Sequence, residues 1–153
     1  MANTEQLSLL QQGIKSWNEW REKHPEVEPD LRKAALRGIN LQGVNLSFAD
    51  LREANLYEAN LCQAKLIQAN LNSADLRKTN LEMADLQSAN LTNADLRKAS
   101  LTMANLSLAN LTVAFLLLAN LQGADLSGAT LEGANLMRVK LKGASLRQVI
   151  CKG

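Results

Sequence analysis

The sequence is poor in aromatic residues, which make up 3% of its 153 positions. Bulky rings usually supply much of the core of a domain of this size. The rings present are Trp17, Trp20, Phe48, Tyr57 and Phe115. So few rings exclude a conventional aromatic core and leave leucine, alanine and asparagine as the residues from which an interior must be built.

Cysteine and histidine are scarcer still. Cys62 and Cys151 are too few and too far apart for a disulfide scaffold or a zinc site, and His24 is the one histidine. No glycine-rich phosphate loop and no Ser/His/Asp or Cys/His arrangement is recognisable. We therefore predict a protein that is not an enzyme, with no catalytic residues, no metal and no cofactor.

Long hydrophobic runs are also lacking. No stretch of about 18 apolar residues occurs, so we expect no transmembrane helix and no membrane partner. The first residues contain no basic stretch followed by an apolar run, as a secretory signal would, which favours a cytoplasmic location. The net charge is +2, divided into −3 over residues 1–30 and +5 over residues 31–153. This basic excess is weak for a general nucleic-acid binder, so nucleic acid is not the expected partner.

What the sequence does contain is a period of five. Leucine occupies every fifth position from Leu31 to Leu146 without exception, 24 times in succession. A small or β-branched residue, mostly alanine, stands two positions before each leucine from Leu36 onward. Asn or Asp usually stands directly before it. We call that place the Asx position and call the two residues after each leucine the first and second variable residues.

Neither a helix nor a flat strand buries leucines at this spacing on one side. Leucines five apart would spiral around every face of an α-helix and would alternate between the faces of a strand. A chain that bends inward once per unit points every leucine at a common axis. Four units then close a coil of 20 residues, and 24 units give six coils, or a rod of roughly 29 Å at the strand spacing of a sheet.

The unit resembles the A(D/N)LXX pattern of the pentapeptide-repeat family, and the resemblance covers residues 31–150. It implies an all-β solenoid, the right-handed quadrilateral parallel β-helix known as the repeated-five-residues (Rfr) fold. We therefore predict a pentapeptide-repeat β-helix of about six coils over residues 31–153, preceded by a separate segment of residues 1–30.

Residues 1–30 are predicted to hold one capping α-helix over residues 4–23, with Thr4 as N-cap. Its apolar stripe, suited to covering the open end of the first coil, comprises Leu7, Leu10, Ile14, Trp17 and Trp20. A partner-binding helix is the alternative. The segment from Leu9 to Arg21, followed by Pro29-Asp30-Leu31, resembles cyanobacterial members of the family.

Residues 20 apart should stack in columns on the outside of the solenoid. One face carries a basic cluster in its variable columns, composed of Arg77, Lys78, Arg97 and Lys98 and tempered by Asp75 and Asp95. Above this cluster the polar pattern is interrupted, because Phe115 takes an Asx position while Leu117, Leu118 and Met137 take variable positions. An exposed apolar patch beside a basic cluster is a candidate partner site. We predict partner binding by Arg77, Lys78, Arg97, Lys98, Phe115, Leu117, Leu118 and Met137.

These features favour a rigid, non-enzymatic scaffold for protein–protein interaction, possessing a regulatory role and a protein partner that the sequence does not name. A homodimer through the same patch and a purely structural role are left open. The family also contains acidic proteins that imitate DNA and bind DNA gyrase, which makes a gyrase-binding DNA mimic the alternative function. The net positive charge of residues 31–153 disfavours it.

Overall fold

The computed structural model describes residues 1–151 and begins with two helices, α1 (Thr4–Gln12) and α2 (Ile14–Lys23). This corrects the expectation of one helix over residues 4–23. Gly13 separates the two helices. Its backbone is extended with a positive φ, a conformation that residues with a side chain rarely adopt. The N-cap of α1 is Asn3 rather than Thr4, because the Asn3 carboxamide oxygen accepts hydrogen bonds from the backbone N–H groups of Glu5 and Gln6.

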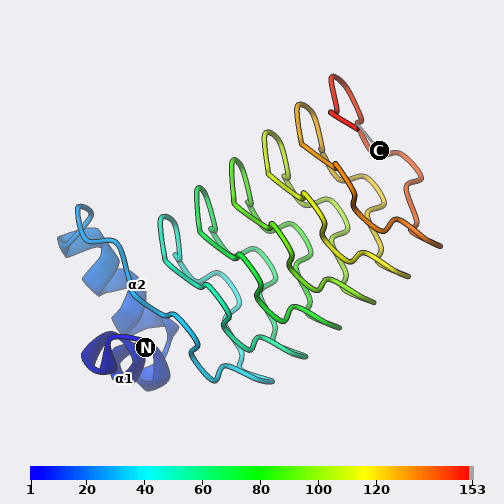
Figure 1. Cartoon of the computed structure of the whole chain (residues 1–153). Helices are drawn as coiled ribbons and strands as arrows, with labels where there is room; N and C mark the ends of the chain where they lie inside the picture. Colours follow the sequence, from blue (N-terminus) through cyan, green and yellow to red (C-terminus); the bar gives the residue numbers. More distant parts are fainter. Residues whose placement is uncertain (152–153) are drawn as a thin grey trace.

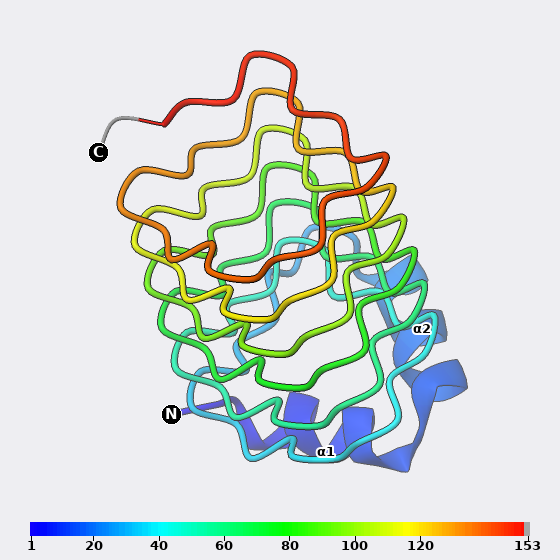
Figure 2. The same cartoon turned by 90° about the vertical axis from the view of Figure 1, so that its right-hand side faces the viewer.

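The rest of the chain is a solenoid in which equivalent residues recur every 20 positions (Figure 1). Pairing takes the form of isolated parallel bridges between Asx positions rather than named strands, beginning with Asp30 to Asp50 and ending with Thr130 to Ile150. Four five-residue units therefore make one coil, and successive coils lie over one another with a similar outline (Figure 2).

Backbone hydrogen bonding explains the Asn/Asp preference of the unit. In the unit built on Leu86, all five N–H groups are satisfied. The N–H groups of Leu86 and of the second variable residue donate to the next coil, and the N–H of the Asx residue donates to the previous coil. The N–H of the following alanine closes a turn on the leucine carbonyl. The fifth, on Gln87, donates to Oδ1 of Asp85 at 3.2 Å. The Asx side chain thus serves a backbone group that the ladder leaves unpaired.

The second variable residue has positive φ throughout the solenoid, at values such as 56° for Ser88 and 69° for Gly123. A tight turn of this kind favours glycine, although most of these positions are occupied by other residues. The glycines at positions 123, 128, 133 and 143 therefore mark the same turn as the earlier coils.

Leucines fill the interior except at the C-terminal end. From Leu31 to Leu126 their exposed fractions are 0–1%, and the alanines two positions earlier are buried with them. Leu136 and Leu141 are only partly buried, and Leu146 is 47% exposed because no further coil of the described residues covers it. Cys151 continues the leucine frame, which by itself predicts a core position, but it is exposed.

Helix α2 lies against the opposite end of the solenoid (Figure 1). The fully buried Trp17 donates its indole Nε1–H to the backbone carbonyl of Asn45 at 2.8 Å. Arg21 is also buried, and its guanidinium donates to the backbone carbonyls of His24, Val27 and Ser47. Burial lowers the pKa of Arg21, but a guanidinium stays charged at any physiological pH.

Candidate partner-binding site

The predicted site residues occupy successive coils of one face. Backbone hydrogen bonds fix their register, since the Lys78 N–H donates to the Arg97 carbonyl at 3.0 Å and the Lys98 N–H donates to the Leu117 carbonyl at 3.0 Å. The Leu118 N–H donates in the same way to the carbonyl of Met137. The 20-residue period therefore brings together residues that are up to 60 positions apart in the sequence.

A hollow of about 340 Å³ lies on this face and is lined by Tyr57, Arg77, Lys78, Arg97, Lys98 and Leu117. Five of these six residues are among the predicted site residues. The other three predicted residues are exposed apolar groups beside Leu117: Phe115 and Leu118 flank it in the same unit and are 44% and 40% exposed, and Met137 lies in the next coil and is 62% exposed. We call these nine residues the candidate face.

Tyr57 is the member that the sequence prediction omitted. Its ring is surrounded by cations, with the Arg37 guanidinium carbon 4.8 Å, the Arg77 carbon 5.2 Å and Lys78 Nζ 5.2 Å from the ring centroid. Such contacts hold long basic side chains in place. The signal that could have found Tyr57 is its place in the first variable column, directly below Arg77.

Carboxylates at the Asx positions fix the two arginines of the hollow. Arg77 donates through Nε and Nη2 to both oxygens of Asp75, at 2.8 and 2.7 Å, and Arg97 makes the same forked pair with Asp95. The Arg77 guanidinium holds the pKa of Asp75 below its usual range. Side chains positioned in this way lose little conformational freedom when a ligand arrives.

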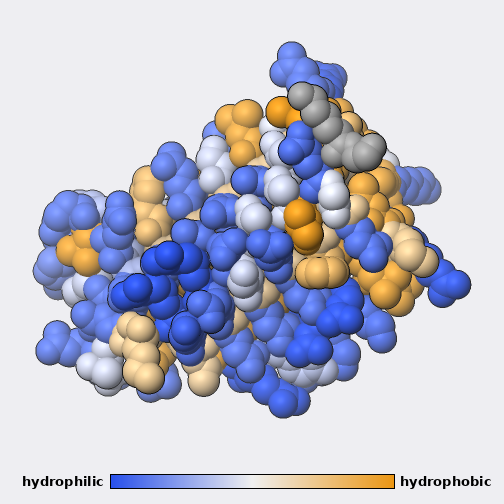
Figure 3. Space-filling view, viewed as in Figure 1, coloured by the Kyte–Doolittle hydropathy of each residue, from blue (hydrophilic) through white to orange (hydrophobic). Residues whose placement is uncertain are grey.

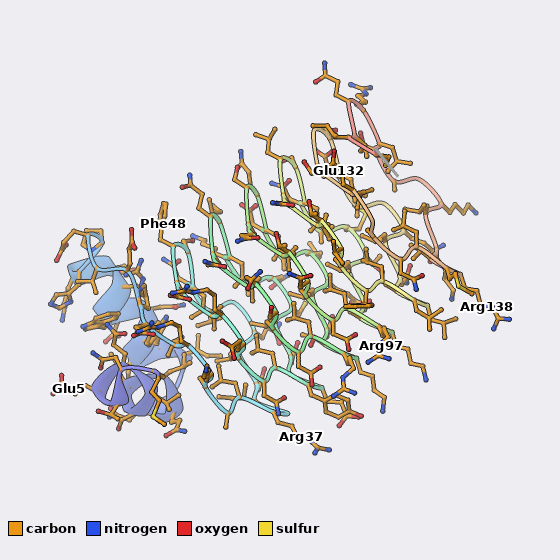
Figure 4. All side chains as sticks on the ribbon, in the orientation of Figure 1. Glu5, Arg37, Phe48, Arg97, Glu132 and Arg138 are labelled. Atoms are coloured by element: carbon orange, nitrogen blue, oxygen red, sulfur yellow. The ribbon has the colours of Figure 1, made fainter. Side chains whose placement is uncertain are left out.

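The two lysines differ in their surroundings. Lys78 Nζ lies 2.9 Å from Oε1 of Glu58, and Tyr57 and Glu58 together raise the pKa of Lys78. Within the part of the chain that the structure describes, Lys98 forms no ion pair. Arg37, Arg97 and Arg138 extend outward on this same side of the solenoid (Figure 4). The face consequently has an excess of positive charge despite its carboxylates.

Phe115 changes the hydrogen bonding of the backbone as well as the character of the surface. The first variable residues Tyr57, Arg77 and Arg97 donate their N–H groups to the Asx side chain two residues earlier. Phenylalanine has no oxygen to accept such a bond, and no group within residues 1–151 receives the N–H of Leu117. The hollow thus has, at its apolar end, a residue whose backbone donor is unpaired.

Apolar surface also gathers toward the C-terminal end of the solenoid (Figure 3). A second hollow, of about 280 Å³, opens there among leucines, and its lining comprises Leu121, Leu126, Leu131, Leu136, Leu141, Leu146, Val149 and Cys151. None of these described lining residues is charged.

Other chemistry is sparse across residues 1–151. The structure there places no three His, Cys, Asp or Glu side chains together as a metal-binding group. Cys62 is half-buried on another face, and His24 lies exposed after α2 with its ring Nδ1 3.0 Å from the Trp20 carbonyl. Helices α1 and α2 are both too short to cross a bilayer, and this range has no other helix.

These repeats place the chain in the pentapeptide-repeat family. Pentapeptide repeats match in eight copies over residues 30–66, 54–93, 84–112 and 116–150. Membership implies the right-handed quadrilateral β-helix, and the 20-residue bridging pattern agrees with it. Proteins of this family are generally non-enzymatic structural or interaction proteins.

The chain is similar to solved cyanobacterial members, which confirms the expected resemblance to that group. HetL, a pentapeptide-repeat protein involved in heterocyst differentiation regulation in Nostoc sp. strain PCC 7120, is 41% identical over 79% of this chain, with a TM-score of 0.29. The match covers 63% of the HetL chain, so this protein spans less than two thirds of that relative. Rfr23 from Cyanothece 51142 is 32% identical over 88% of this chain and 97% of its own, with a TM-score of 0.40.

More distant likenesses add nothing beyond the fold. QnrB1, a plasmid-mediated fluoroquinolone resistance protein, is 16% identical over 81% of this chain and 87% of its own, with a TM-score of 0.35. No curated protein sequence matches the chain significantly.

Proposed function

We propose that this protein is a non-enzymatic scaffold that binds a protein partner through the candidate face. The observation that carries this proposal is the interruption of the repeat at Phe115, where apolar side chains replace polar ones beside a preformed cationic hollow. Exposed apolar surface costs free energy unless something covers it, and interfaces are centred on apolar anchors. A regulatory role is supported by the similarity to HetL, which is involved in regulating heterocyst differentiation.

Rigidity is part of the proposed function. Residues 31–153, of which 152–153 lie outside the described part of the chain, are proposed to form a repeat domain of about six coils, with residues 1–30 as a separate cap whose helices α1 and α2 close the first coil. The indole bond from Trp17 to the Asn45 carbonyl and the bond from Arg21 to the Ser47 carbonyl support this cap, because they attach α2 to the first units of the solenoid. A cytoplasmic location stays a prediction from the sequence.

Site-specific photo-cross-linking tests the interface. A photoreactive amino acid in place of Leu117 should yield a discrete adduct with one protein in a lysate of the source organism. The same amino acid in place of Thr102, a first variable residue of the neighbouring face, should yield none. Equal adduct patterns from both positions would refute the candidate face as the interface.

Self-association is the second candidate, favoured by the open apolar hollow at the C-terminal end. Light scattering coupled to size exclusion over a range of concentrations distinguishes the two sources of a dimer. Leu117→Asp should abolish a dimer formed through the candidate face, whereas Leu146→Asp should abolish one formed through the C-terminal hollow. A monomer at all concentrations leaves the candidate face for a different protein.

The gyrase-binding alternative rests on family resemblance alone. A DNA mimic must present a strongly negative surface, and residues 31–153 have a net charge of +5. We therefore expect no inhibition of DNA supercoiling by gyrase at micromolar concentrations of this protein. Inhibition at that concentration would reverse the assignment.

A further inference from the structure

If the proposed function holds, the residues of the hollow indicate the chemistry of the partner segment that occupies it. We propose that its occupant is a short acidic segment of a partner protein in which one bulky apolar residue lies within a few positions of the carboxylates. Three properties of the hollow support this proposal: its charge balance, its apolar end with the unpaired N–H of Leu117, and its length.

The charges around the hollow determine the sign of the charge on the ligand and limit how strongly electrostatics can bind it. Four cations line the hollow, and Glu58, Asp75 and Asp95 lie against three of them. Lys98 remains as a cation without an ion pair in the described chain, and the paired arginines keep further N–H donors on the guanidinium. Carboxylates suit this arrangement. A nucleic acid needs a long row of cations for its phosphates, and three of the four cations in the hollow already lie against carboxylates, which disfavours it.

The apolar end of the hollow sets the second requirement. Leu117 lines it, and the exposed side chains of Phe115 and Leu118 border it. An apolar residue of the partner that packs there removes these groups from water, which adds affinity that charge alone does not supply. The Leu117 N–H offers a donor for a carbonyl or carboxylate oxygen at the same place.

Length sets the spacing. Tyr57, Arg77, Arg97 and Leu117 lie in four successive coils, so the hollow spans three coil spacings, or about 14 Å. An extended segment of four or five residues covers that distance at about 3.3 Å per residue. The acidic residues and the apolar anchor should therefore fall within five consecutive positions.

A random peptide library displayed on phage and selected on the intact protein tests this inference. Enriched peptides should contain two or more carboxylates and one aromatic or large aliphatic residue within five positions. Synthetic copies should lose at least about tenfold in affinity on Lys98→Glu, because that change reverses the lysine of the hollow that has no ion pair within residues 1–151. Lys65→Glu is the matched control, since it makes the same charge change on another face and should leave affinity unchanged.

Phe115→Asn tests the apolar end without risk of unfolding. Asparagine is the residue that the repeat prefers there, and it restores the acceptor for the Leu117 N–H, so the variant should be at least as stable as the native protein. It should nevertheless lose about tenfold in affinity for the selected peptides. A folded variant with unchanged affinity would exclude the apolar anchor.

The results separate this inference from the proposed function. Basic or neutral peptides that still lose affinity on Phe115→Asn would overturn the acidic chemistry and leave the interface standing. Peptides that bind both variants as tightly as the native protein would overturn the interface as well. Failure to enrich any peptide, or tighter binding of fluorescent oligothymidylate than of the selected peptides, would overturn the acidic segment as ligand.

Discussion

Replacing Leu86 by alanine should destabilise the protein far more than replacing Leu146, although both leucines occupy equivalent places in the repeat 60 residues apart. Leu86 is completely buried, and Leu146 is 47% exposed. Removing a fully buried leucine costs about 2–5 kcal/mol, because the transfer free energy is lost and a closed cavity remains. At Leu146 about half of the transfer free energy is already absent and no closed cavity forms, so the loss should be about 1 kcal/mol.

Urea unfolding followed by circular dichroism measures the difference. With a slope of about 2 kcal/mol per molar urea, a loss of about 3 kcal/mol lowers the midpoint by about 1.5 M, and a loss of about 1 kcal/mol lowers it by about 0.5 M. The slopes must be compared as well, because a solenoid with an altered coil can unfold in parts. Equal midpoint shifts for Leu86→Ala and Leu146→Ala would show that the last coil is covered and would refute an open end.

Three further substitutions test single contacts. In the native protein the Arg32 guanidinium holds the pKa of the Asp30 carboxyl at about 2, so this exposed ion pair contributes its full stabilisation, below about 1 kcal/mol, only above the ordinary pKa of the carboxyl. Asp30→Asn removes that contribution, and the difference in Tm between variant and native protein should vanish as pH falls from about 4 to 2. A difference in Tm that stays constant over this range would contradict the ion pair. Trp17→Phe replaces the fully buried indole by a smaller ring that has no N–H and leaves the Asn45 carbonyl without its donor, so calorimetry should show a loss of at least about 1–3 kcal/mol, whereas no loss would argue against the indole bond. Thr79→Val removes a buried hydroxyl that donates to a backbone carbonyl at 2.9 Å, and chemical unfolding should show a loss of about 1 kcal/mol, an unchanged midpoint being the contrary result.

The leucine frame could be predicted from the sequence because each unit repeats one physical demand. A period of five has one solution that buries every leucine, and the 20-residue coil follows from four sides. The break of the N-terminal helix at Gly13 was missed because an apolar stripe continues across it from Leu10 to Ile14, so the spacing alone favours one helix. Thr4 fits an N-cap by residue type, but Asn3 offers the same chemistry one residue earlier, and its side chain makes the bond.

The site could be predicted in part for the same reason. Stacking at 20-residue intervals places Arg77, Arg97 and Leu117 in one column, and the structure does bring them to one hollow. The cations around Tyr57 and the forked arginine pairs depend on side-chain conformations that a periodic pattern does not specify. The exposure of Leu146 escaped prediction because its unit obeys the repeat, and burial depends on whether another coil follows.

Because the interior of this fold is uniform, its surface can be altered without disturbing the residues that stabilise it. Each unit takes its stability from the leucine, the small residue and backbone hydrogen bonds between coils, none of which involves a variable side chain. Substitutions at Lys98 or Leu117 should therefore alter binding at little cost in stability, unlike substitutions in a globular core. At Phe115 the residue that creates the apolar end of the face also removes the side-chain oxygen that would accept the N–H of Leu117. A position where local stability is sacrificed without benefit to the interior is where selection for a surface property is most directly visible.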